Sequence, residues 1–272
     1  MRLALLASLA LACGGQAAPP TKSAPVAVEL TDWKPLSFGS YLAPVSSAPS
    51  VTLIWHFHAC RAAENDYRSL AGNIVVVCLD NLGMGTAPYW DAFKDPHRFG
   101  VLEREVMAAL GPGVHVERTV LVAWSAGYAS IQQILNAPDV YDRTSAVVLL
   151  DGLHAGYTKN ADGSPTRVAN IDTVGSLLRF ARDASTGNKA FVFTHSAVVP
   201  VGYASTTEMA HALEDRLTMV RGSADPDFAQ SIDVADLGNL HVRGFAGGRA
   251  KHHITQLHWL APVLRKWVLI SH

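Results

Sequence analysis

Short apolar runs separated by helix-like segments constrain the fold of this chain more than any other feature. The runs are rich in valine and leucine and mostly continuous, with little alternation between apolar and polar residues. This pattern is typical of parallel strands that are buried on both faces of a sheet. The predicted strands are Val51–Ala59, Asn73–Asp80, Arg118–Trp124, Ser145–Gly152, Lys189–Ser196 and Asn239–Gly247.

Helix-like segments occupy the intervals between these runs. The segment that ends at Leu110 is followed by Gly-Pro-Gly, which stops a helix, and another begins with Ser205 and Glu208 at capping-box spacing. The last segment, from Ile254, carries apolar residues at steps of three and four. Strands that alternate with helices predict an α/β fold in which a mostly parallel central sheet carries helices on both faces.

Length and charge restrict the domain organisation and the partners of the chain. Its 272 residues contain no internal repeat, so we expect one folded domain over residues 29–272. The formal net charge is −1, and the sequence has no block of lysine or arginine. A nucleic-acid partner would need a basic face, so we expect none.

The N-terminus resembles an export signal. Met1 and Arg2 precede the apolar run LALLASLALA, which is too short to span a bilayer, and small residues lead to Cys13. Residues 1–12 are therefore predicted to be a signal peptide, and Cys13 a lipidated residue as in bacterial lipoproteins, although Ala10 stands where leucine is usual. Residues 13–28 are predicted to be the lipidated cysteine and a flexible tether. The expected location is the cell envelope, with the membrane as partner through Cys13; secretion without an anchor is the alternative.

Two further cysteines, Cys60 and Cys78, leave a disulfide open. An exported protein could join them, but Cys78 lies inside an apolar run and could equally be an unpaired core residue.

The stretch VLVAWSAGYASIQQIL, Val120 to Leu135, passes abruptly from a predicted strand into a predicted helix. Ser125 lies at this corner, between the small residues Ala123 and Gly127. Small residues two positions to either side of a serine allow a sharp turn, on which the hydroxyl projects above the sheet beside the free N–H groups of a new helix. The corner therefore predicts a nucleophilic serine.

With this corner and the order of its other parts, the chain resembles the α/β-hydrolase superfamily over most of residues 30–272. An oxyanion loop after an early strand, a mid-chain nucleophile, a later acid and a late histidine follow one another in the order found there. Ala123 departs from the glycine that is usual at its position. Leu153–Asn188, where many members insert a lid, is short, so the resemblance implies a minimal lid and an open site.

The resemblance implies a Ser-His-Asp triad with Ser125 as the nucleophile. Its base is expected after the last strand, where His253 is preferred because it directly precedes the final helix, with His252 as the alternative. The orienting carboxylate is expected to be Asp151, because the following strand has no acid near its end. The weaker alternatives for the carboxylate are Asp225 and Asp227.

An oxyanion that develops in the transition state needs preorganised N–H donors. The resemblance implies one donor from Ala126, the residue after the nucleophile. The other is expected from Ala59 or Cys60, in the loop after the first run, where Ala59 takes the place of a glycine.

Histidines and aromatic residues gather where predicted strands end, and we expect some of them to bind substrate. His56 and His58 share one face of a strand, which invites a zinc interpretation, but no cysteine pair or His-Glu-x-x-His motif accompanies them. We therefore expect no metal and no cofactor. The candidate substrate-binding residues are His58, His154, His195, Trp124 and Tyr89, with Trp90 beside it; packing is the alternative role for each.

Taken together, these features predict an extracytoplasmic serine hydrolase that cleaves carboxylic esters through an acyl-enzyme. Its expected partner is an ester-bearing small molecule or a polysaccharide, since an open site admits bulky substrates. The alternatives are a peptidase or amidase with the same triad, and a non-catalytic envelope lipoprotein.

Overall fold

The computed structural model describes residues 28–46, 48–80 and 82–269. The predicted signal peptide (1–12), Cys13 and all but the last residue of the predicted tether (13–28) lie outside the described residues, and what the sequence indicates about them stays a prediction. Within the described ranges, no helix is both long and apolar enough to cross a membrane.

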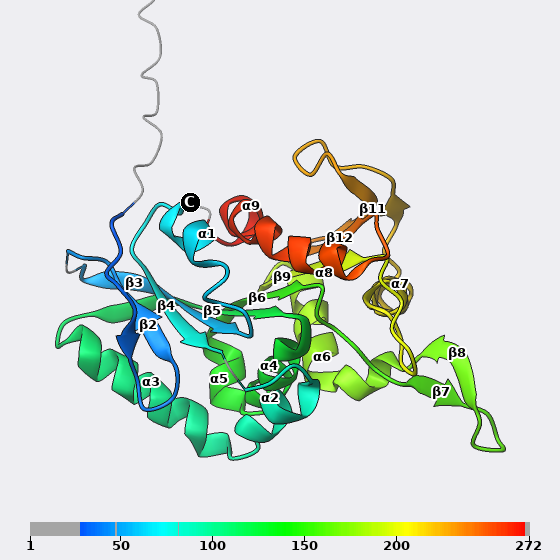
Figure 1. Ribbon diagram of the computed structural model, residues 1–272, viewed down its shortest axis with the longest axis horizontal. Coiled ribbons are helices and arrows are strands. Elements are labelled where there is room, and N and C mark those ends of the chain that lie inside the picture. The colour runs from blue at the N-terminus through cyan, green and yellow to red at the C-terminus, as the bar shows by residue number, and fades with distance from the viewer. Residues whose placement is uncertain (1–27, 47, 81, 270–272) are drawn as a thin grey trace, which may run out of the picture.

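A ten-stranded, mostly parallel sheet forms the centre of the molecule (Figure 1). Six central strands run parallel in the order β4-β3-β5-β6-β9-β12, and antiparallel strands extend both edges. The six predicted runs form these six central strands, which confirms them, whereas the sequence pattern did not indicate the edge strands. The strands are β1 (Lys34–Pro35), β2 (Ser40–Leu42), β3 (Ser50–Phe57), β4 (Ile74–Leu79), β5 (His115–Trp124), β6 (Thr144–Leu150), β9 (Ala190–Ser196), β10 (Arg221–Gly222), β11 (Ser231–Leu237) and β12 (Leu240–Phe245).

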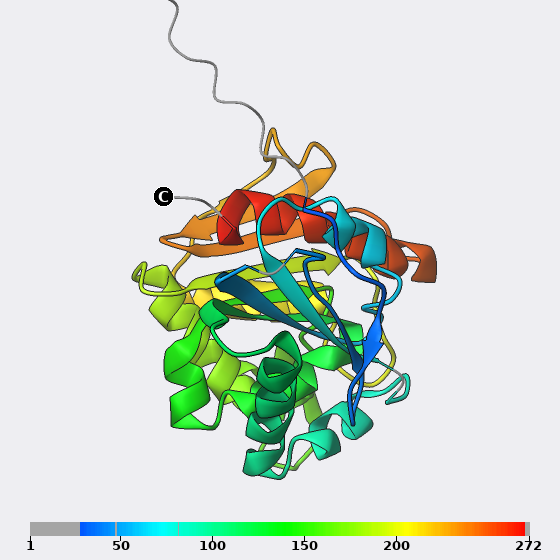
Figure 2. The same cartoon turned by 90° about the vertical axis from the view of Figure 1, so that its left-hand side faces the viewer.

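Helices cover both faces of the sheet, which confirms the predicted fold class (Figures 1 and 2). One face carries α1 (Glu64–Arg68), α8 (Ala250–Thr255) and α9 (Leu260–Val263). The other carries α2 (Thr86–Ala92), α3 (Pro96–Leu110), α4 (Tyr128–Ile134), α5 (Pro138–Arg143), α6 (Gly175–Ser185) and α7 (Thr206–Leu217). The predicted capping box is present at the start of α7, where Ser205 and Glu208 bond to each other's backbone N–H groups.

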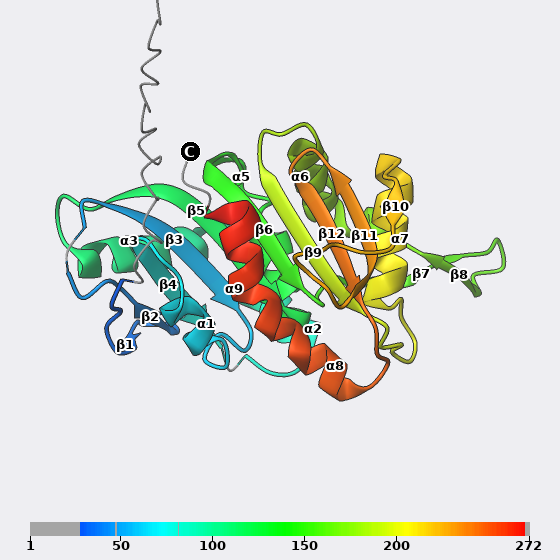
Figure 3. The same cartoon turned by 90° about the horizontal axis from the view of Figure 1, so that it is seen from above.

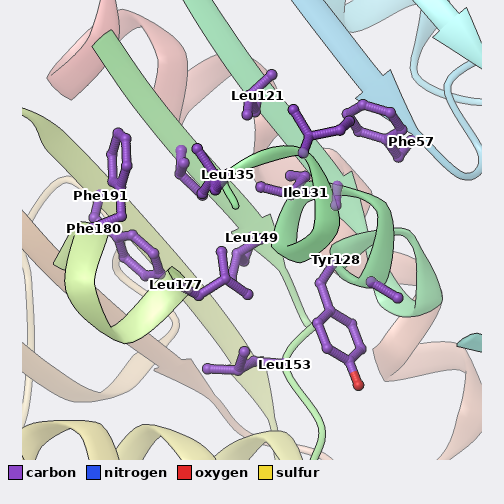
Figure 4. Packing of buried hydrophobic residues seen from close by; sticks show 14 of the residues in the cluster. Phe57, Leu121, Tyr128, Ile131, Leu135, Leu149, Leu153, Leu177, Phe180 and Phe191 are labelled. Carbon is purple, nitrogen blue, oxygen red and sulfur yellow. The ribbon is translucent and has the colours of Figure 1, made fainter. Parts of the chain in front are cut away.

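Each central strand contributes to two apolar layers, one on each face. In β3, Leu53 and Trp55 pack into the layer beneath α3 and α4, and Ile54 packs into the opposite one. Figure 4 shows part of the first layer, to which Leu121 of β5, Leu149 of β6 and Leu135, at the end of α4, all belong. Burial on both faces explains why the strands read as continuous apolar runs.

The final segment forms consecutive short turns where the sequence pattern indicates one helix. After α8, a 3-10 turn (Gln256–Trp259) leads to α9, and a π turn (Leu264–Val268) follows. Pro262 lies within α9 and has no backbone N–H to donate, which favours such irregularity. Seen from above, these turns cross the sheet as one rod (Figure 3).

A small hairpin of β7 (Tyr157–Lys159) and β8 (Pro165–Ala169) projects from the body of the molecule beyond β6 (Figure 1). The sequence indicated only that this interval is short. The hairpin is tethered by the Tyr157 hydroxyl, which donates to the Glu208 carboxylate at the start of α7. The interval therefore holds a short projection and no large lid.

Cys60 and Cys78 form a disulfide, which settles the question left open by the sequence. Their Cα atoms lie 5.5 Å apart, because β3 and β4 are adjacent and His56 pairs with Cys78 in register. The bond ties the loop that follows β3 to the end of β4.

Replacing both cysteines by alanine is expected to lower the free energy of unfolding by about 2–4 kcal/mol, the usual contribution of a native disulfide. Urea denaturation monitored by circular dichroism measures the difference. A thiol reductant should lower the midpoint of the wild type and leave that of the double variant unchanged. Equal stability of the oxidised wild type and the variant would contradict this role.

Candidate active site

Ser125 lies on a sharp turn between β5 and α4, at the carboxyl end of the parallel strands. Its φ of +50° is in the left-handed region, which costs a non-glycine residue about 1–3 kcal/mol and persists only where the surroundings enforce it. A Cβ at Gly127 would lie 2.2 Å from the Phe57 carbonyl oxygen, so only glycine fits there. A Cβ at Gly152 would lie 2.5 Å from the Ser125 carbonyl oxygen. Close backbone contacts on both sides therefore hold the turn.

His253 bridges the serine and a buried carboxylate. Its Nε2 lies 2.8 Å from Ser125 Oγ, and its Nδ1 lies 2.7 Å from Asp151 Oδ2. Because the carboxylate accepts from Nδ1, a neutral imidazole presents a lone pair at Nε2 to the serine hydroxyl. The structure thus brings together Ser125, His253 and Asp151, from three segments far apart in the sequence.

Asp151 is held ionised by its hydrogen bonds. The Ser196 N–H and hydroxyl donate to it at 2.8 and 2.6 Å, and the Thr206 hydroxyl donates at 2.5 Å. Burial raises the pKa of the carboxyl, but the hydrogen bonds from His253, Ser196 and Thr206 outweigh it, so the pKa of Asp151 lies below its ordinary value. The imidazole therefore faces a fixed negative charge.

Unusual backbone conformations gather around this arrangement. Five non-glycine residues have a positive φ in the described part of the chain, and four of them are His58, Ala59, Ser125 and Asp151. Such conformations cluster at functional sites, where packing of the surrounding fold enforces them. Here the strain lies at the ends of three neighbouring strands, β3, β5 and β6.

The N–H groups expected to stabilise an oxyanion do not all remain available. Ala126 lies in the first turn of a helix, where N–H groups have no partner within the helix. The Ala59 N–H donates to Asp80 Oδ1 at 2.8 Å, so the expectation that Ala59 serves an oxyanion is wrong. The Cys60 N–H donates to no other described residue and remains the candidate from that loop.

Two aromatic candidates for substrate binding are packed within the site instead. Tyr89 is completely buried, and its hydroxyl lies 2.6 Å from His58 Nδ1, so Tyr89 cannot serve as a substrate platform. Trp124 lies between His58 and His253, with ring centroids 5.0 and 4.6 Å away. Its Nε1 also donates to the His253 carbonyl at 3.0 Å. Trp124 thus stacks on His253 and His58 stacks on Trp124, and together they help to fix the position of His253.

A pocket of about 420 Å³ opens beside the serine. Tyr128, His154 and Tyr203 lie in its wall with Ser125 and Ala126. The Tyr128 hydroxyl donates to the His154 carbonyl at 2.7 Å, and the rings of His154 and Tyr203 meet edge to face at 5.2 Å. Of the three histidines expected to bind substrate, His154 is the one that lines this pocket.

Trp90 lines a neighbouring pocket of about 300 Å³, which shares Thr86, Tyr128 and His154 with the first. The two spaces therefore adjoin, and an indole side chain flanks the second one. Of the adjacent aromatic residues Tyr89 and Trp90, only Trp90 faces open space.

The other candidates lie elsewhere. His195 is buried against Thr207 and Asp233 and does not line the serine pocket among the described residues, so its expected role in substrate binding is wrong. His252 points away from Ser125 and accepts from the Arg249 N–H at 3.0 Å. Asp225 pairs with Arg243, and Asp227 with Lys266, so neither carboxylate reaches His253.

Sequence reasoning missed the side chains that support Asp151. Ser196 is the last residue of β9, which is adjacent to β6, and Thr206 is the first residue of α7. The capping box at Ser205 marks where that helix begins, and strand adjacency would have placed Ser196 next to Asp151. Neither the capping box nor strand adjacency identifies the contacts with Asp151 unless the register of β6 on β9 is known.

Asp151→Asn is expected to remove part of the acid sensitivity of the fold. Because the pKa of Asp151 is lower in the folded protein than in the unfolded chain, its contribution to stability is complete above the unfolded value of about 4 and is lost as pH falls below it. The difference in free energy of unfolding between wild type and Asp151→Asn should therefore shrink below about pH 4. Urea titrations at several pH values measure it, and a difference that does not change with pH would contradict the lowered pKa.

Comparison with known proteins gives only distant likenesses. No protein-family model matches the chain, and no curated protein matches it in sequence. Similar solved structures include carboxylesterase CesB from Bacillus subtilis (9% identity, 91% of this chain and 94% of that one, TM-score 0.44). An esterase from an Arctic intertidal metagenomic library is 13% identical over 85% of this chain and 87% of its own, with a TM-score of 0.45. The acylaminoacyl peptidase of Pyrococcus horikoshii is 12% identical over 92% of this chain, which spans 43% of that protein, with a TM-score of 0.48.

Proposed function

We propose that this chain is a serine hydrolase that cleaves carboxylic esters through an acyl-enzyme. The observation that carries the proposal is the hydrogen-bonded series Ser125–His253–Asp151, with distances of 2.8 and 2.7 Å. A serine hydroxyl becomes an effective nucleophile when a base accepts its proton and a carboxylate orients that base. The strained corner that exposes the serine beside a pocket adds support.

In the proposed reaction Ser125 Oγ attacks the ester carbonyl carbon while His253 Nε2 takes the hydroxyl proton. The carbonyl π electrons move to oxygen, and the N–H groups of Ala126 and Cys60 bind the resulting oxyanion. When the tetrahedral intermediate collapses, the C–O bond to the alcohol breaks and His253 returns the proton to the leaving oxygen. Water then repeats the sequence on the acyl-enzyme, which releases the acid and restores the serine. Asp151 stabilises the imidazolium in both halves.

The proposed substrates are esters with a bulky partner, such as acyl groups on a polysaccharide. The pocket is walled by tyrosine and histidine side chains, and Met84 at its rim is 83% exposed. Aromatic side chains with polar tips suit contacts with sugar rings and hydroxyls. Ser125 is half-buried in the pocket wall, and in this proposal a long substrate chain extends past it.

We propose that the protein acts outside the cytoplasm, anchored through Cys13. The Cys60–Cys78 disulfide supports this location, since structural disulfides persist mainly in oxidising compartments. The export signal predicted for residues 1–12 supports it from the sequence side.

A fluorophosphonate probe should label the wild-type protein and leave Ser125→Ala unlabelled, because the probe captures an activated serine. Gel fluorescence measures labelling, and circular dichroism verifies that the variant is folded. A folded wild type that takes up no label would contradict the proposal. For a labelled protein, acetylated sugars, aryl esters and peptide amides offered in parallel should show ester cleavage as the fastest reaction.

His253→Ala and His252→Ala form a matched pair of neighbouring histidines. Loss of the general base should lower kcat for an aryl ester by about 10⁴–10⁶-fold in His253→Ala. His252→Ala should retain kcat close to the wild-type value, because its ring bonds to the Arg249 backbone and not to Ser125. The reverse order of losses would reassign the base to His252.

A further inference from the structure

A second cluster of polar side chains lies between α7 and the sheet, apart from the serine pocket. His195 of β9 pairs in register with Gly244 of β12, and Gly244 pairs with Asp233 of β11. Partners in register share one face of a sheet, so His195 and Asp233 lie on the same face with a glycine between them. His195 Nε2 is 3.5 Å from Asp233 Oδ2.

Gly244 makes this approach feasible. A Cβ at that position would lie 2.5 Å from His195 Nε2 and 2.8 Å from the Asp233 Cβ. Any side chain on β12 there would occupy the space in which the imidazole and the carboxylate meet. The absence of a side chain at Gly244 thus leaves a space between His195 and Asp233, which we call the cradle.

Helix α7 closes the cradle with two further ligand-type side chains. His211 and Glu214 are one turn apart, so both face the sheet. His211 Nε2 lies 2.9 Å from Asp233 Oδ2. One donor atom from each of His211, Glu214 and Asp233 lies within 4.8 Å of the other two. These distances suit a single cation shared by the three.

Two buried atoms of the cluster have no hydrogen-bond partner among the described residues. These atoms are His195 Nε2 and Glu214 Oε1, on residues that are 3% and 0% exposed. Buried polar atoms are normally paired, because an unmet one costs about 1–3 kcal/mol. The other oxygen of Glu214 accepts from Arg221, which leaves Oε1 available.

The orientation of His195 follows from its other nitrogen. The Thr207 hydroxyl donates its proton to the Ser196 carbonyl at 2.8 Å, so its oxygen accepts from His195 Nδ1 at 2.9 Å. Nε2 therefore faces the Asp233 carboxylate, 3.5 Å away.

We propose that this cluster binds one zinc ion, with His211, Glu214 and Asp233 as ligands. One imidazole nitrogen and two carboxylate oxygens are donor types that zinc accepts. His195 lies beside these three residues, 3.5 Å from the Asp233 carboxylate. The buried Glu214 and the half-buried Asp233 are opposed by one arginine, which leaves negative charge for a dication to neutralise.

The zinc would be structural, because none of its three ligands lines the serine pocket. The ion would join α7 to β11. Because Thr206, a donor to Asp151, is the first residue of α7, the site would also help to fix the helix that supports this carboxylate.

Zinc binding by the untagged full chain, stripped with a chelator, tests the proposal. Isothermal titration with zinc chloride and elemental analysis after gel filtration should give one zinc per chain. His211→Ala, which removes a half-exposed ligand, should weaken binding by more than the roughly 10–100-fold typical of a lost outer-shell partner. Asp233→Asn should do the same.

The control variant is His241→Ala. His241 bonds to Asp236 at 2.6 Å in the same β11–β12 hairpin, yet no third ligand-type residue accompanies the pair in the described part of the chain. Its loss should leave zinc affinity unchanged. Cobalt substituted into the wild type should give the strong visible absorption of a tetrahedral site, a readout that needs no variant. Absence of bound zinc, or equal affinity in wild type, His211→Ala and Asp233→Asn, would overturn the proposal.

Discussion

A single buried carboxylate connects the parts of the candidate active site. Asp151 accepts hydrogen bonds from Ser196 at the end of β9, from Thr206 at the start of α7 and from His253 on α8. A carboxylate that is buried is costly unless its oxygens are fully paired, and here each oxygen has two donors. The hydrogen bonds to this charge bring four elements together. The His253 imidazole, which donates one of them, is oriented toward Ser125 without any contact from substrate.

The sheet supplies the rigidity that this arrangement needs. Backbone strain at His58, Ser125 and Asp151 is tolerated because each residue follows a central strand that is packed on both faces. Gly127 and Gly152 allow the chain to pass within contact distance of the turn that carries Ser125. Conformations that would relax in an isolated loop are thus enforced by neighbours on either side.

The sequence indicates the parts whose cause is local. Continuous apolar runs identify the six central strands, and small residues around Ser125 identify the corner, because each pattern lies within one short segment of the chain. Sequence patterns do not reveal contacts that depend on the register of neighbouring strands. The pairing of Cys60 with Cys78, the donors to Asp151 and the burial of Tyr89 all follow from which strands and loops are adjacent in space. The same holds for the neighbouring residues His252 and His253. Their spacing does not show which ring contacts Ser125, because the two rings point in different directions.

Asp151, the carboxylate of the candidate site, follows β6. The connection between β9 and α7 therefore carries no acid that the site needs. That connection carries Val199 and Val201 on the outside, 74% and 96% exposed, and delivers Tyr203 to the pocket wall. Substitutions or insertions there would reshape the pocket wall while Ser125, His253 and Asp151 stay in place. Under the proposed function, descendants of this chain could therefore diverge in substrate preference through one surface segment.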